Sequence, residues 1–324
     1  MSQTIHLSID AMGGDLGPRL SVPASLSFLK KHPNVSITLV GDLEQIRAEL
    51  GGFEHSQLKL APSEGLVSMS DKPGAVLRRG KSTSMWQAVE MVANGSAQGC
   101  LSAGNTGALM AISRHLLGMR EGFDRPAICK AMPSKGGACQ LLDLGANIEC
   151  SPELLAQFAV LGVETARVAG HERSRVGLLN IGVEDQKGYE DLHVAAKLMA
   201  EDGSYEFIGF VEADQIYSGV ADVIVCDGFA GNVALKASEG VVRYIRREIK
   251  QWYGQTWFRK ALGLMFWPLL LSFHSRFDPD RYNGACFVGL NGVVVKSHGG
   301  ANKRGYEYAL SATYAYALNR SIAT

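Results

Sequence analysis

Short apolar runs rich in β-branched residues alternate along the chain with longer segments in which apolar residues recur at the helical period. The short runs predict strands at residues 5–10, 35–40, 57–61, 98–102, 127–132, 138–143, 176–181, 206–211, 222–227, 285–290 and 293–297. The longer segments predict helices at residues 18–31, 42–50, 82–94, 106–119, 152–169, 189–201, 232–253 and 303–319. Because short connections join strands to helices, we expect right-handed βαβ crossovers. The pattern is typical of a three-layer α/β/α fold around a mostly parallel, Rossmann-like sheet.

Two helix starts carry capping signals. The sequence SPE, which begins at Ser151, fits an N-cap, a proline at the first helical position and an acidic first turn. Ser82 or Ser84 is placed to cap the predicted helix at 82–94, just before Trp86. No repeat, low-complexity stretch or linker interrupts the pattern, so residues 1–324 are expected to form a single α/β domain.

Composition narrows the class of protein. The 324 residues are 46% hydrophobic and include 32 basic and 32 acidic residues, so the formal net charge is zero. A nucleic-acid-binding protein usually carries a basic excess, and we expect no nucleic-acid partner. The six cysteines are scattered without a CxxC pair, as is typical of reduced core residues in a cytosolic protein. The N-terminal sequence shows no pattern of a secretory signal, which favours a cytoplasmic location.

Small and polar residues collect where the predicted strands end. The first such loop, SIDAMGGDLGP, joins a strand to a helix, as do the loops that hold a pyrophosphate in dinucleotide folds. Four further loops share this composition: LSAGNTGALM (101–110), LLDLGANIECSPE (141–153), LLNIGVEDQKG (178–188) and VIVCDGFAGNVALK (223–236). Turn and N-cap chemistry accounts equally well for any one of them. Together, we expect the five loops to meet at one carboxyl edge of the sheet and form a ligand site.

Two of these loops are suited to binding an anion. Gly104 and Gly107 permit close backbone approach, and the helix that follows them directs free N–H groups to the same point. The loop from Asp227 to Asn232 has the same form, with Lys236 in the helix that follows. Neither loop contains the GxxxxGK[ST] sequence of a P-loop nucleotide site.

Other chemistries have weaker support. The first loop lacks the G-x-G-x-x-G spacing, but Asp42 ends the next predicted strand, where a ribose-binding acid falls in dinucleotide folds. A nicotinamide site therefore stays open at this point. No HExxH, EF-hand or paired Cys/His spacing is present, so no metal site is expected, and the hydrolase GxSxG sequence is absent. His298 lies between a strand and a helix, where a catalytic and a structural role both fit.

Six segments taken together resemble one family. They are DAMGGDLGP, SAGNTGALMA, LLDLGANIEC, LLNIGVEDQKG, DVIVCDGFAGNVALKASEGV and YNGACFVGLNGVVVKSHGGAN. In this order, over residues 5–303, they are similar to the bacterial phosphate acyltransferases, the acyl-acyl-carrier-protein:phosphate acyltransferases of phospholipid synthesis. SDKPGAVLRRGKSTSM (70–85) also resembles a segment of that family. The chain departs from the family at Val183, where the family often has the first of three acids.

The resemblance implies an enzyme that moves a fatty acyl group from acyl carrier protein to inorganic phosphate, with no cofactor. A membrane glycerol-3-phosphate acyltransferase then uses the acyl phosphate in phospholipid biosynthesis. The resemblance also implies a homodimer with a fold akin to phosphotransacetylase and isopropylmalate dehydrogenase, and peripheral association with the inner face of the cell membrane. Residues 1–324 are thus expected to be one catalytic domain.

The chemistry favours a site built for positioning. The second pKa of phosphate is about 6 and a thiol has a pKa of about 8.5, so neither a strong base nor a strong acid is required. Orientation and electrostatic stabilisation are expected to carry the rate, with carboxylates orienting loops and cations. The expected catalytic residues are Lys187, His298, Asn105 and Asp227. The expected substrate- and phosphate-binding residues are Asp10, Gly13, Gly14, Asp15, Ser102, Gly104, Thr106, Gly107, Asn147, Asn232 and Lys236.

A helical apolar segment is expected around residues 243–280. It opens with the basic residues Arg243, Arg246, Arg247 and Lys250. The apolar run at 261–273 is too short to span a bilayer. Either it is buried in a dimer interface, or its apolar face enters the lipid boundary while the basic residues meet anionic headgroups or dock the acidic carrier protein. The expected membrane-contacting residues are Leu264, Phe266, Trp267, Leu269 and Leu270, and the rival docking residues are Arg78, Arg79 and Lys81.

Three alternatives stay open from the sequence. A coenzyme-A-dependent phosphate acyltransferase has the same reaction class with another thiol carrier. An NAD-dependent dehydrogenase has a related fold. A membrane-surface scaffold for lipid enzymes has no catalytic site, and it leaves the polar strand ends unexplained.

Overall fold

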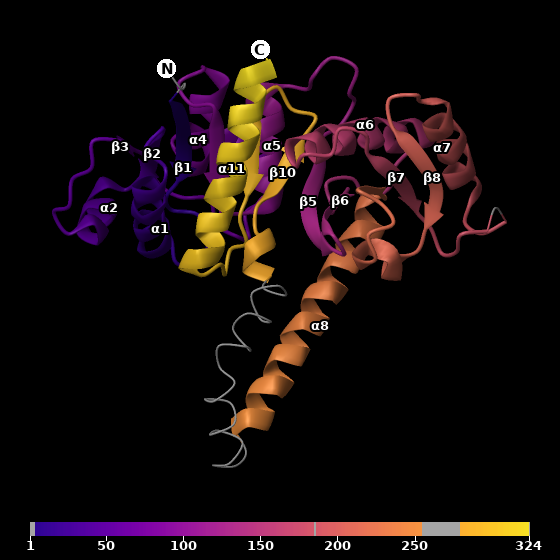
Figure 1. Ribbon diagram of the computed structural model, residues 1–324. Helices are drawn as coiled ribbons and strands as arrows, with labels where there is room; N and C mark the ends of the chain where they lie inside the picture. The colour runs from indigo at the N-terminus through magenta and orange to yellow at the C-terminus, as the bar shows by residue number, and fades with distance from the viewer. Residues whose placement is uncertain (1–3, 185, 255–278, 324) are drawn as a thin grey trace.

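The computed structural model describes residues 4–184, 186–254 and 279–323 (Figure 1). The strands are β1 (Ile5–Asp10), β2 (Val35–Gly41), β3 (Leu58–Pro62), β4 (Gly99–Ser102), β5 (Ala127–Ser134), β6 (Gly137–Leu142), β7 (Arg175–Leu179), β8 (Glu206–Val211), β9 (Val223–Val225), β10 (Ala285–Val288) and β11 (Val293–Lys296). They form one 11-stranded sheet in the order β3-β2-β1-β4-β11-β10-β5-β6-β9-β7-β8. Each strand overlaps one that the apolar pattern predicts.

Helices cover both faces of this sheet. They are α1 (Pro18–Lys31), α2 (Leu43–Leu50), α3 (Pro73–Arg79), α4 (Ser84–Ala93), α5 (Thr106–Leu117), α6 (Pro152–Val168), α7 (Glu190–Glu201), α8 (Gly228–Gly254) and α11 (Lys303–Ala323), with short 3-10 turns η1 (Ala213–Tyr217) and η2 (Pro279–Tyr282). One core lies between the sheet and helices α1, α2, α6, α7 and α11. The other lies between the sheet and α3, α4, α5, η1 and the start of α8. The predicted three-layer α/β/α fold is confirmed.

The strands do not all run in one direction. β1, β2, β3, β4 and β11 form one parallel group, and β6, β7, β8 and β9 form another. Between the groups, the antiparallel pairings β11–β10, β10–β5 and β5–β6 reverse the direction three times. The loops after β1 and β4 therefore leave one edge of the sheet, and those after β6, β7 and β9 leave the other. The expectation that all five polar loops meet at a single carboxyl edge is wrong, because apolar periodicity does not encode strand direction.

Helix α8 projects from the body of the fold (Figure 1). It begins at Gly228 rather than at residue 232. Elements α3, η1 and η2 were not predicted, since they have seven, five and four residues and too little periodicity to be recognised.

The expected membrane contacts Leu264, Phe266, Trp267, Leu269 and Leu270 fall in 255–278, outside the described residues. Within the described ranges, no helix combines the length and apolar character needed to cross a bilayer.

The caps explain two of the helix starts. Ser151 is the N-cap of α6 as predicted, and its hydroxyl accepts a hydrogen bond from the Leu154 N–H. The cap of α4 is Thr83 rather than Ser82 or Ser84, because the Thr83 hydroxyl accepts the N–H of the first turn. The Ser84 side chain is then available for a contact inside the site.

Candidate functional site

The first group of polar residues lies at the carboxyl ends of β1, β4 and β11. Asp10 ends β1 and is only 1% exposed. The hydroxyls of Ser84 and Ser102 donate hydrogen bonds to its two carboxylate oxygens, each at 2.6 Å. Burial raises the pKa of Asp10, and these two donors oppose the rise. Asp10 therefore ties the first loop to α4 and β4.

Glycine is required where the loops after β1 and β4 touch. A Cβ on Gly13 would lie 2.6 Å from Asp10 Oδ2 and 2.8 Å from the Gly104 nitrogen. Asp15, in the same loop, donates its N–H to the carbonyl oxygen of Gly299 at 3.0 Å. The structure thus brings together six of the predicted binding residues: Asp10, Gly13, Gly14, Asp15, Ser102 and Gly104.

A lysine absent from the predicted set lies beside this group. Lys296 ends β11, and its ammonium group donates to the carbonyl oxygens of Ser297 and, at 3.2 Å, Ala103. Burial lowers the pKa of Lys296 to about 8, against the opposing effect of the negative charges on Asp10 and Asp15. The signal that could have identified Lys296 is a lysine closing the otherwise apolar strand VVVK.

The Asn105 side chain is engaged by the protein itself. Its oxygen accepts the Ala108 N–H at 3.0 Å and caps α5. Its amide nitrogen faces the carbonyl oxygens of Ser68, Met69 and Asp71 at 3.0–3.2 Å. Because both ends of the amide are occupied, these contacts favour a structural brace between α5 and the 68–71 loop. A catalytic role for Asn105 stays a prediction.

The remaining predicted residues of the first group are exposed. Thr106 and Gly107 form the first turn of α5. His298 follows β11, and its Nδ1 accepts a hydrogen bond from the Gly300 N–H at 3.1 Å. This contact fixes the ring within its own loop and places the proton of a neutral ring on Nε2. Its catalytic role likewise stays a prediction.

The second group surrounds the start of α8. Asp143 follows β6, is fully buried and accepts the N–H groups of Ile128 at 2.8 Å and Asn147 at 2.7 Å. The Asn147 amide donates to Asp143 Oδ2 at 3.0 Å and to the Pro126 oxygen at 2.8 Å. Burial raises the pKa of Asp143, and these donors oppose the rise. Asn147 is thus a buried brace, and its carbonyl oxygen receives the N–H of Gly228 at 2.7 Å.

Asp227 joins α8 to the loop that carries Lys187. Its Oδ1 accepts the Ala230 N–H at 2.7 Å, and its Oδ2 accepts the Tyr189 hydroxyl at 3.2 Å. Burial, followed by the charge of Asp227, raises the pKa of Tyr189 to about 12, so the phenol stays protonated and donates. Lys187 is exposed in the 180–189 loop that this contact holds against α8.

The start of α8 packs tightly on the second group. A Cβ on Gly231 would lie 1.9 Å from the Asp143 carbonyl oxygen and 2.8 Å from Cys226 Sγ. Asn232 follows at the surface, with its side chain beside Gly145. Because the first turn of α8 packs this closely against Asp143 and Cys226, it fixes the direction in which the rest of α8 crosses the sheet.

Three lysines come together where α8 passes the middle of the sheet, and we call them the lysine cluster: Lys130, Lys236 and Lys296. Lys236 lowers the pKa of both Lys130 and Lys296, so its exposed ammonium group lies within electrostatic range of each of the other two. Burial is the larger cause of the lowered pKa of Lys130, whose Nζ lies 3.4 Å from Glu239 Oε1. The cluster connects β5, α8 and β11, and so joins the second group to the first.

Metal and dinucleotide chemistry each concern particular side chains among the described residues. Among them, no three or more His, Cys, Asp or Glu side chains are grouped so that they could hold a metal ion. Asp42 caps α2 by accepting the N–H groups of Glu44 and Gln45 at 2.9 and 3.2 Å. Its carboxylate is therefore engaged in helix capping rather than presented as a ribose acceptor.

Comparison with known proteins defines the class first. The fold is similar to a phosphotransacetylase from Streptococcus pyogenes, with a TM-score of 0.68, 17% identity, and coverage of 98% of this chain and 95% of that chain. It is also similar to a 4-hydroxythreonine-4-phosphate dehydrogenase from Salmonella typhimurium, with a TM-score of 0.55, 14% identity, and coverage of 98% and 100%. The architecture is thus the one shared by phosphotransacetylases and dehydrogenases of related fold, as the resemblance implied.

Sequence relatives then decide the family. A family profile described as "Fatty acid synthesis protein" matches residues 5–322. A phosphate acyltransferase of Saccharophagus degradans is 49% identical over 311 residues, covering 96% of this chain and 91% of the relative. Another, from Teredinibacter turnerae, is 48% identical over 313 residues, covering 96% and 95%. The chain belongs to the phosphate acyltransferase family and is an acyltransferase of fatty acid and phospholipid synthesis.

Proposed function

We propose that this chain transfers a fatty acyl group from acyl carrier protein to inorganic phosphate, giving acyl phosphate and free carrier protein. The observation that carries the proposal is the lysine cluster, where burial lowers the pKa of two of the three ammonium groups. Positive charges that lie close together and are partly shielded from water are strongly stabilised by a bound dianion. Phosphate at neutral pH supplies such a charge, since its second pKa is about 6.

In the proposed step, a phosphate oxygen attacks the thioester carbonyl carbon, a C–O bond forms and the C–S bond breaks. The thiolate leaves with the electron pair and takes the proton that hydrogenphosphate carried, so no external acid or base is consumed. Lys296, held by backbone carbonyls and oriented by Asp10 and Asp15, attracts the phosphate. Lys236 adds charge from α8. A catalytic role for Lys187, whose loop leaves the other edge of the sheet, stays a prediction.

The rate is expected to fall as the pH rises through about 8. Lys296 must be protonated to attract phosphate, and burial lowers its pKa to about 8. The measurement is kcat/KM between roughly pH 6.5 and 9.5, with uncatalysed thioester hydrolysis subtracted. A wild-type profile that stays flat over the alkaline half of this range contradicts the assignment. For folding, the sign is opposite. Burial disfavours the charged form of Lys296, so the shift lowers the free energy of unfolding below about pH 8. This penalty is relieved as the pH rises from about 8 to the ordinary lysine pKa of 10.5, where the unfolded state binds the proton and the folded state does not, so stability rises with pH in this range.

Two substitutions separate a direct role from a structural one. Lys187→Ala removes an exposed charge, so we expect kcat/KM to fall about tenfold or more with an unchanged melting temperature. Asn105→Ala removes a cap and the brace to the 68–71 loop, so we expect a loss of about 1 kcal/mol or more of stability together with any loss of activity. Lys197→Ala, an exposed lysine on α7, is the matched control and should keep full activity. Near-normal turnover in Lys187→Ala would remove that residue from the proposed site.

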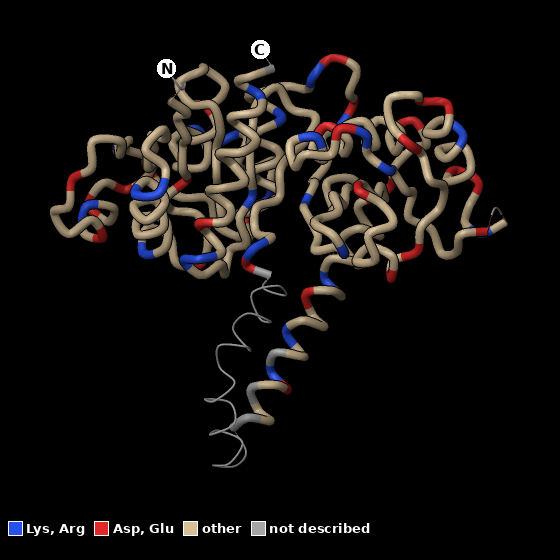
Figure 2. The backbone as a smooth tube through the Cα atoms, viewed as in Figure 1, with Lys and Arg blue, Asp and Glu red and all other residues tan. Residues whose placement is uncertain are grey.

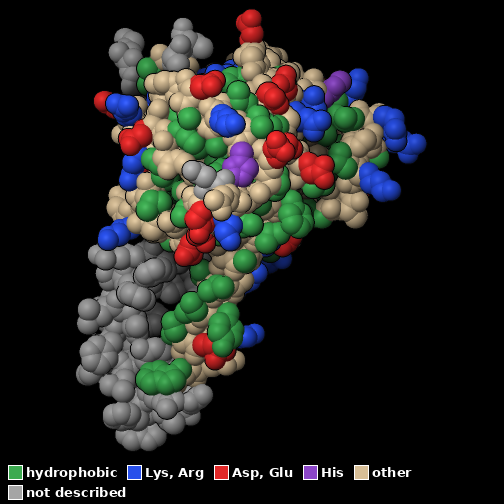
Figure 3. Space-filling model, turned by 90° about the vertical axis from the view of Figure 1, so that its right-hand side faces the viewer, with side chains coloured by type: hydrophobic (Ala, Val, Ile, Leu, Met, Phe, Trp, Pro, Cys, Tyr) green, Lys and Arg blue, Asp and Glu red, His purple; other side chains and the backbone are tan. Residues whose placement is uncertain are grey.

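We also propose a homodimer at the inner face of the cell membrane, where the acyl phosphate can pass to a glycerol-3-phosphate acyltransferase. Support comes from α8, along which apolar side chains are exposed at Val241, Tyr244, Ile245, Ile249 and Trp252 (Figure 3). Basic residues lie on the same helix (Figure 2), including Arg243 and Arg247, whose side chains are 68% and 64% exposed. An apolar stripe beside basic residues suits an anionic lipid surface.

Liposome flotation tests the membrane part of this proposal. Trp267→Glu with Leu270→Glu places two charges in the expected lipid-contacting run, so binding to vesicles with anionic lipid should fall at least tenfold. Phe53→Glu, an exposed apolar residue far from α8 in sequence, is the control and should float as wild type. Unchanged flotation of the double variant means that this segment is not the anchor.

A further inference from the structure

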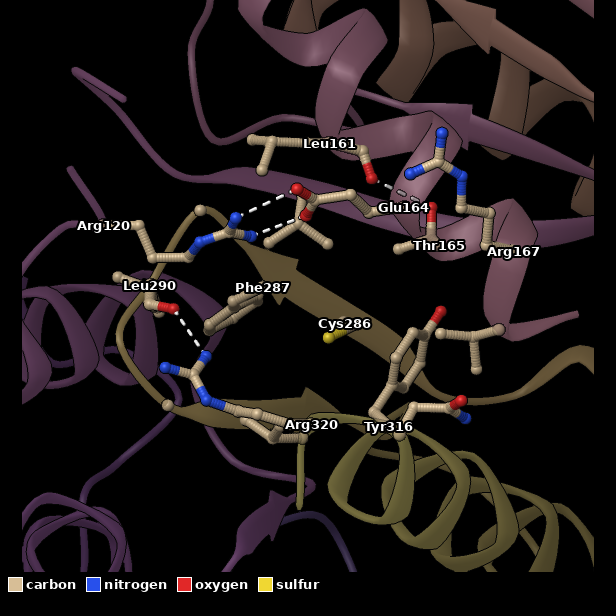
Figure 4. Close-up of a pocket in the computed structure, with 16 residues that line it drawn as sticks. Arg120, Leu161, Glu164, Thr165, Arg167, Cys286, Phe287, Leu290, Tyr316 and Arg320 are labelled. Atoms are coloured by element: carbon tan, nitrogen blue, oxygen red, sulfur yellow. Dashed lines mark hydrogen bonds and ion pairs between the residues drawn. The ribbon is translucent and has the colours of Figure 1, made fainter. Parts of the chain in front are cut away.

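A pocket lies on the face of the sheet opposite to the lysine cluster. It has a volume of about 550 Å³ and is formed between α6 and α11 over β10 and β11 (Figure 4). Side chains alternate along a strand, so Val293 in the pocket floor and Lys296 at the end of the same strand point to opposite faces. The pocket is therefore separate from the proposed acyl-transfer site, and nothing in the proposed reaction uses it.

The apolar part of the pocket lining is buried. Leu161 of α6 is 1% exposed, Cys286 of β10 is 4% exposed and Val293 of β11 is 6% exposed. Val168, at the end of α6, adds a partly exposed aliphatic side chain to the lining. A volume in the range of about 300–1,000 Å³ with mostly apolar walls is typical of small-molecule sites.

The polar part of the lining is basic. Arg120, Arg167 and Arg320 contribute three positive charges, and Glu164 contributes one negative charge. Glu164 is committed to Arg120 through two hydrogen bonds, at 2.5 Å and 2.9 Å. Arg320 donates to the Leu290 carbonyl oxygen at 3.1 Å, and Figure 4 shows its guanidinium group on the same side of the pocket as that of Arg120.

Electrostatics at this position favours an added anion. Burial lowers the pKa of Arg320, and the nearby positive charge of Arg120 lowers it further, while the negative charge of Glu164 opposes the fall. An arginine fork binds a carboxylate or a phosphate with two hydrogen bonds, and such a ligand also relieves the repulsion between the two guanidinium groups.

We infer that the pocket binds an anionic amphiphile, with its carboxylate or phosphate head at Arg320, beside the Arg120–Glu164 ion pair, and its aliphatic tail against Leu161, Cys286 and Val293. Free fatty acids and alkyl or acyl phosphates share this chemistry. The ligand touches α6, which packs against β6 and β9 of the second parallel group, and α11, which packs against β4 and β11 of the first. It therefore bridges the two halves of the sheet at the β10–β5 boundary.

Calorimetric titration of the purified full-length chain tests the ligand chemistry. Dodecanoate and dodecyl phosphate, each kept below its micelle concentration, are the two anionic probes, and their relative affinities distinguish the two sources. Dodecyltrimethylammonium carries the same tail with a positive head, and inorganic phosphate carries the head alone. We expect saturable binding of at least one of the two anionic probes. Dodecyltrimethylammonium and inorganic phosphate should each bind at least tenfold more weakly. Equal binding of the cationic probe, or uptake only above the micelle concentration, overturns the inference.

Two variants locate the binding. Val168→Trp fills the pocket from a partly exposed position and should abolish binding, while Arg320→Gln should weaken it about tenfold or more. Arg47→Gln, on the exposed face of α2, is the matched control and should bind as wild type. Melting curves establish that each variant is folded. Unchanged affinity in both pocket variants overturns the inference whatever the outcome of the acyl-transfer assays, because the readout is binding and not turnover.

Discussion

Replacing Lys296 by methionine is expected to lower kcat/KM for acyl phosphate formation about 100- to 1,000-fold, the effect of removing one well-placed charge from a poorly solvated site. Methionine keeps the length and volume of the buried stem but has no ammonium group to attract phosphate. The KM for phosphate should rise, and the alkaline fall in the pH profile should disappear, since the group that titrates near pH 8 is gone.

The controls for this prediction lie in the same sheet. Lys59→Met makes the same substitution at an exposed lysine of β3 and should keep activity within about twofold of wild type, as is usual for surface changes. Lys296→Arg retains the charge and should recover part of the activity without the alkaline fall, because arginine stays protonated. If Lys296→Met turns over as fast as wild type and keeps the alkaline fall, Lys296 is not the cation that holds phosphate.

Gly231→Ala is expected to disrupt both folding and turnover. The new Cβ would lie 1.9 Å from the Asp143 carbonyl oxygen, a backbone atom that cannot move aside alone. Overpacking of this kind typically costs about 1–3 kcal/mol and at backbone contacts more, so the melting temperature should fall by several degrees. Activity should fall as well, because a shifted helix start displaces Asn232 and Lys236.

Gly240→Ala provides the control on the same helix. A Cβ at Gly240 meets no atom within 4 Å. Alanine is the better helix former by about 0.8–1.0 kcal/mol, so this change should leave stability equal or higher and activity unchanged. If Gly231→Ala melts and turns over like Gly240→Ala, the contact between α8 and the second group does not position the site.

The fold was largely predictable because its signals are local. Strand and helix periodicities lie within single segments, and the cap at Ser151 lies next to the helix that it starts. Strand direction depends instead on pairing between distant segments, so β5, β6 and β10 gave no indication that they reverse the sheet. That reversal separates the loops of β1 and β4 from those of β6, β7 and β9, which the sequence pattern could not reveal.

The site was predictable only in part, for the same reason. Gly-rich loops can be recognised from the sequence alone. Four residues predicted from them lie close together in the structure: Asp10, Gly13, Ser102 and Gly104. Other polar residues in those loops, such as Asn147, prove to hold the loops together, because a short side chain satisfies the nearest backbone groups first. Two members of the lysine cluster, Lys130 and Lys296, were not predicted. Each is a single charge within an apolar strand, and its proximity to Lys236 depends on how α8 crosses the sheet.

Acyl phosphate formation by the purified chain tests the central claim most directly. The protein is incubated with acyl-carrier-protein thioester or with the matching coenzyme A thioester, each with and without inorganic phosphate, and acyl phosphate and free thiol are measured together. We predict equal amounts of acyl phosphate and free thiol, formed only when phosphate is present and faster from the carrier-protein thioester. Thiol release without phosphate, or phosphate-dependent turnover of the coenzyme A thioester alone, would contradict this account.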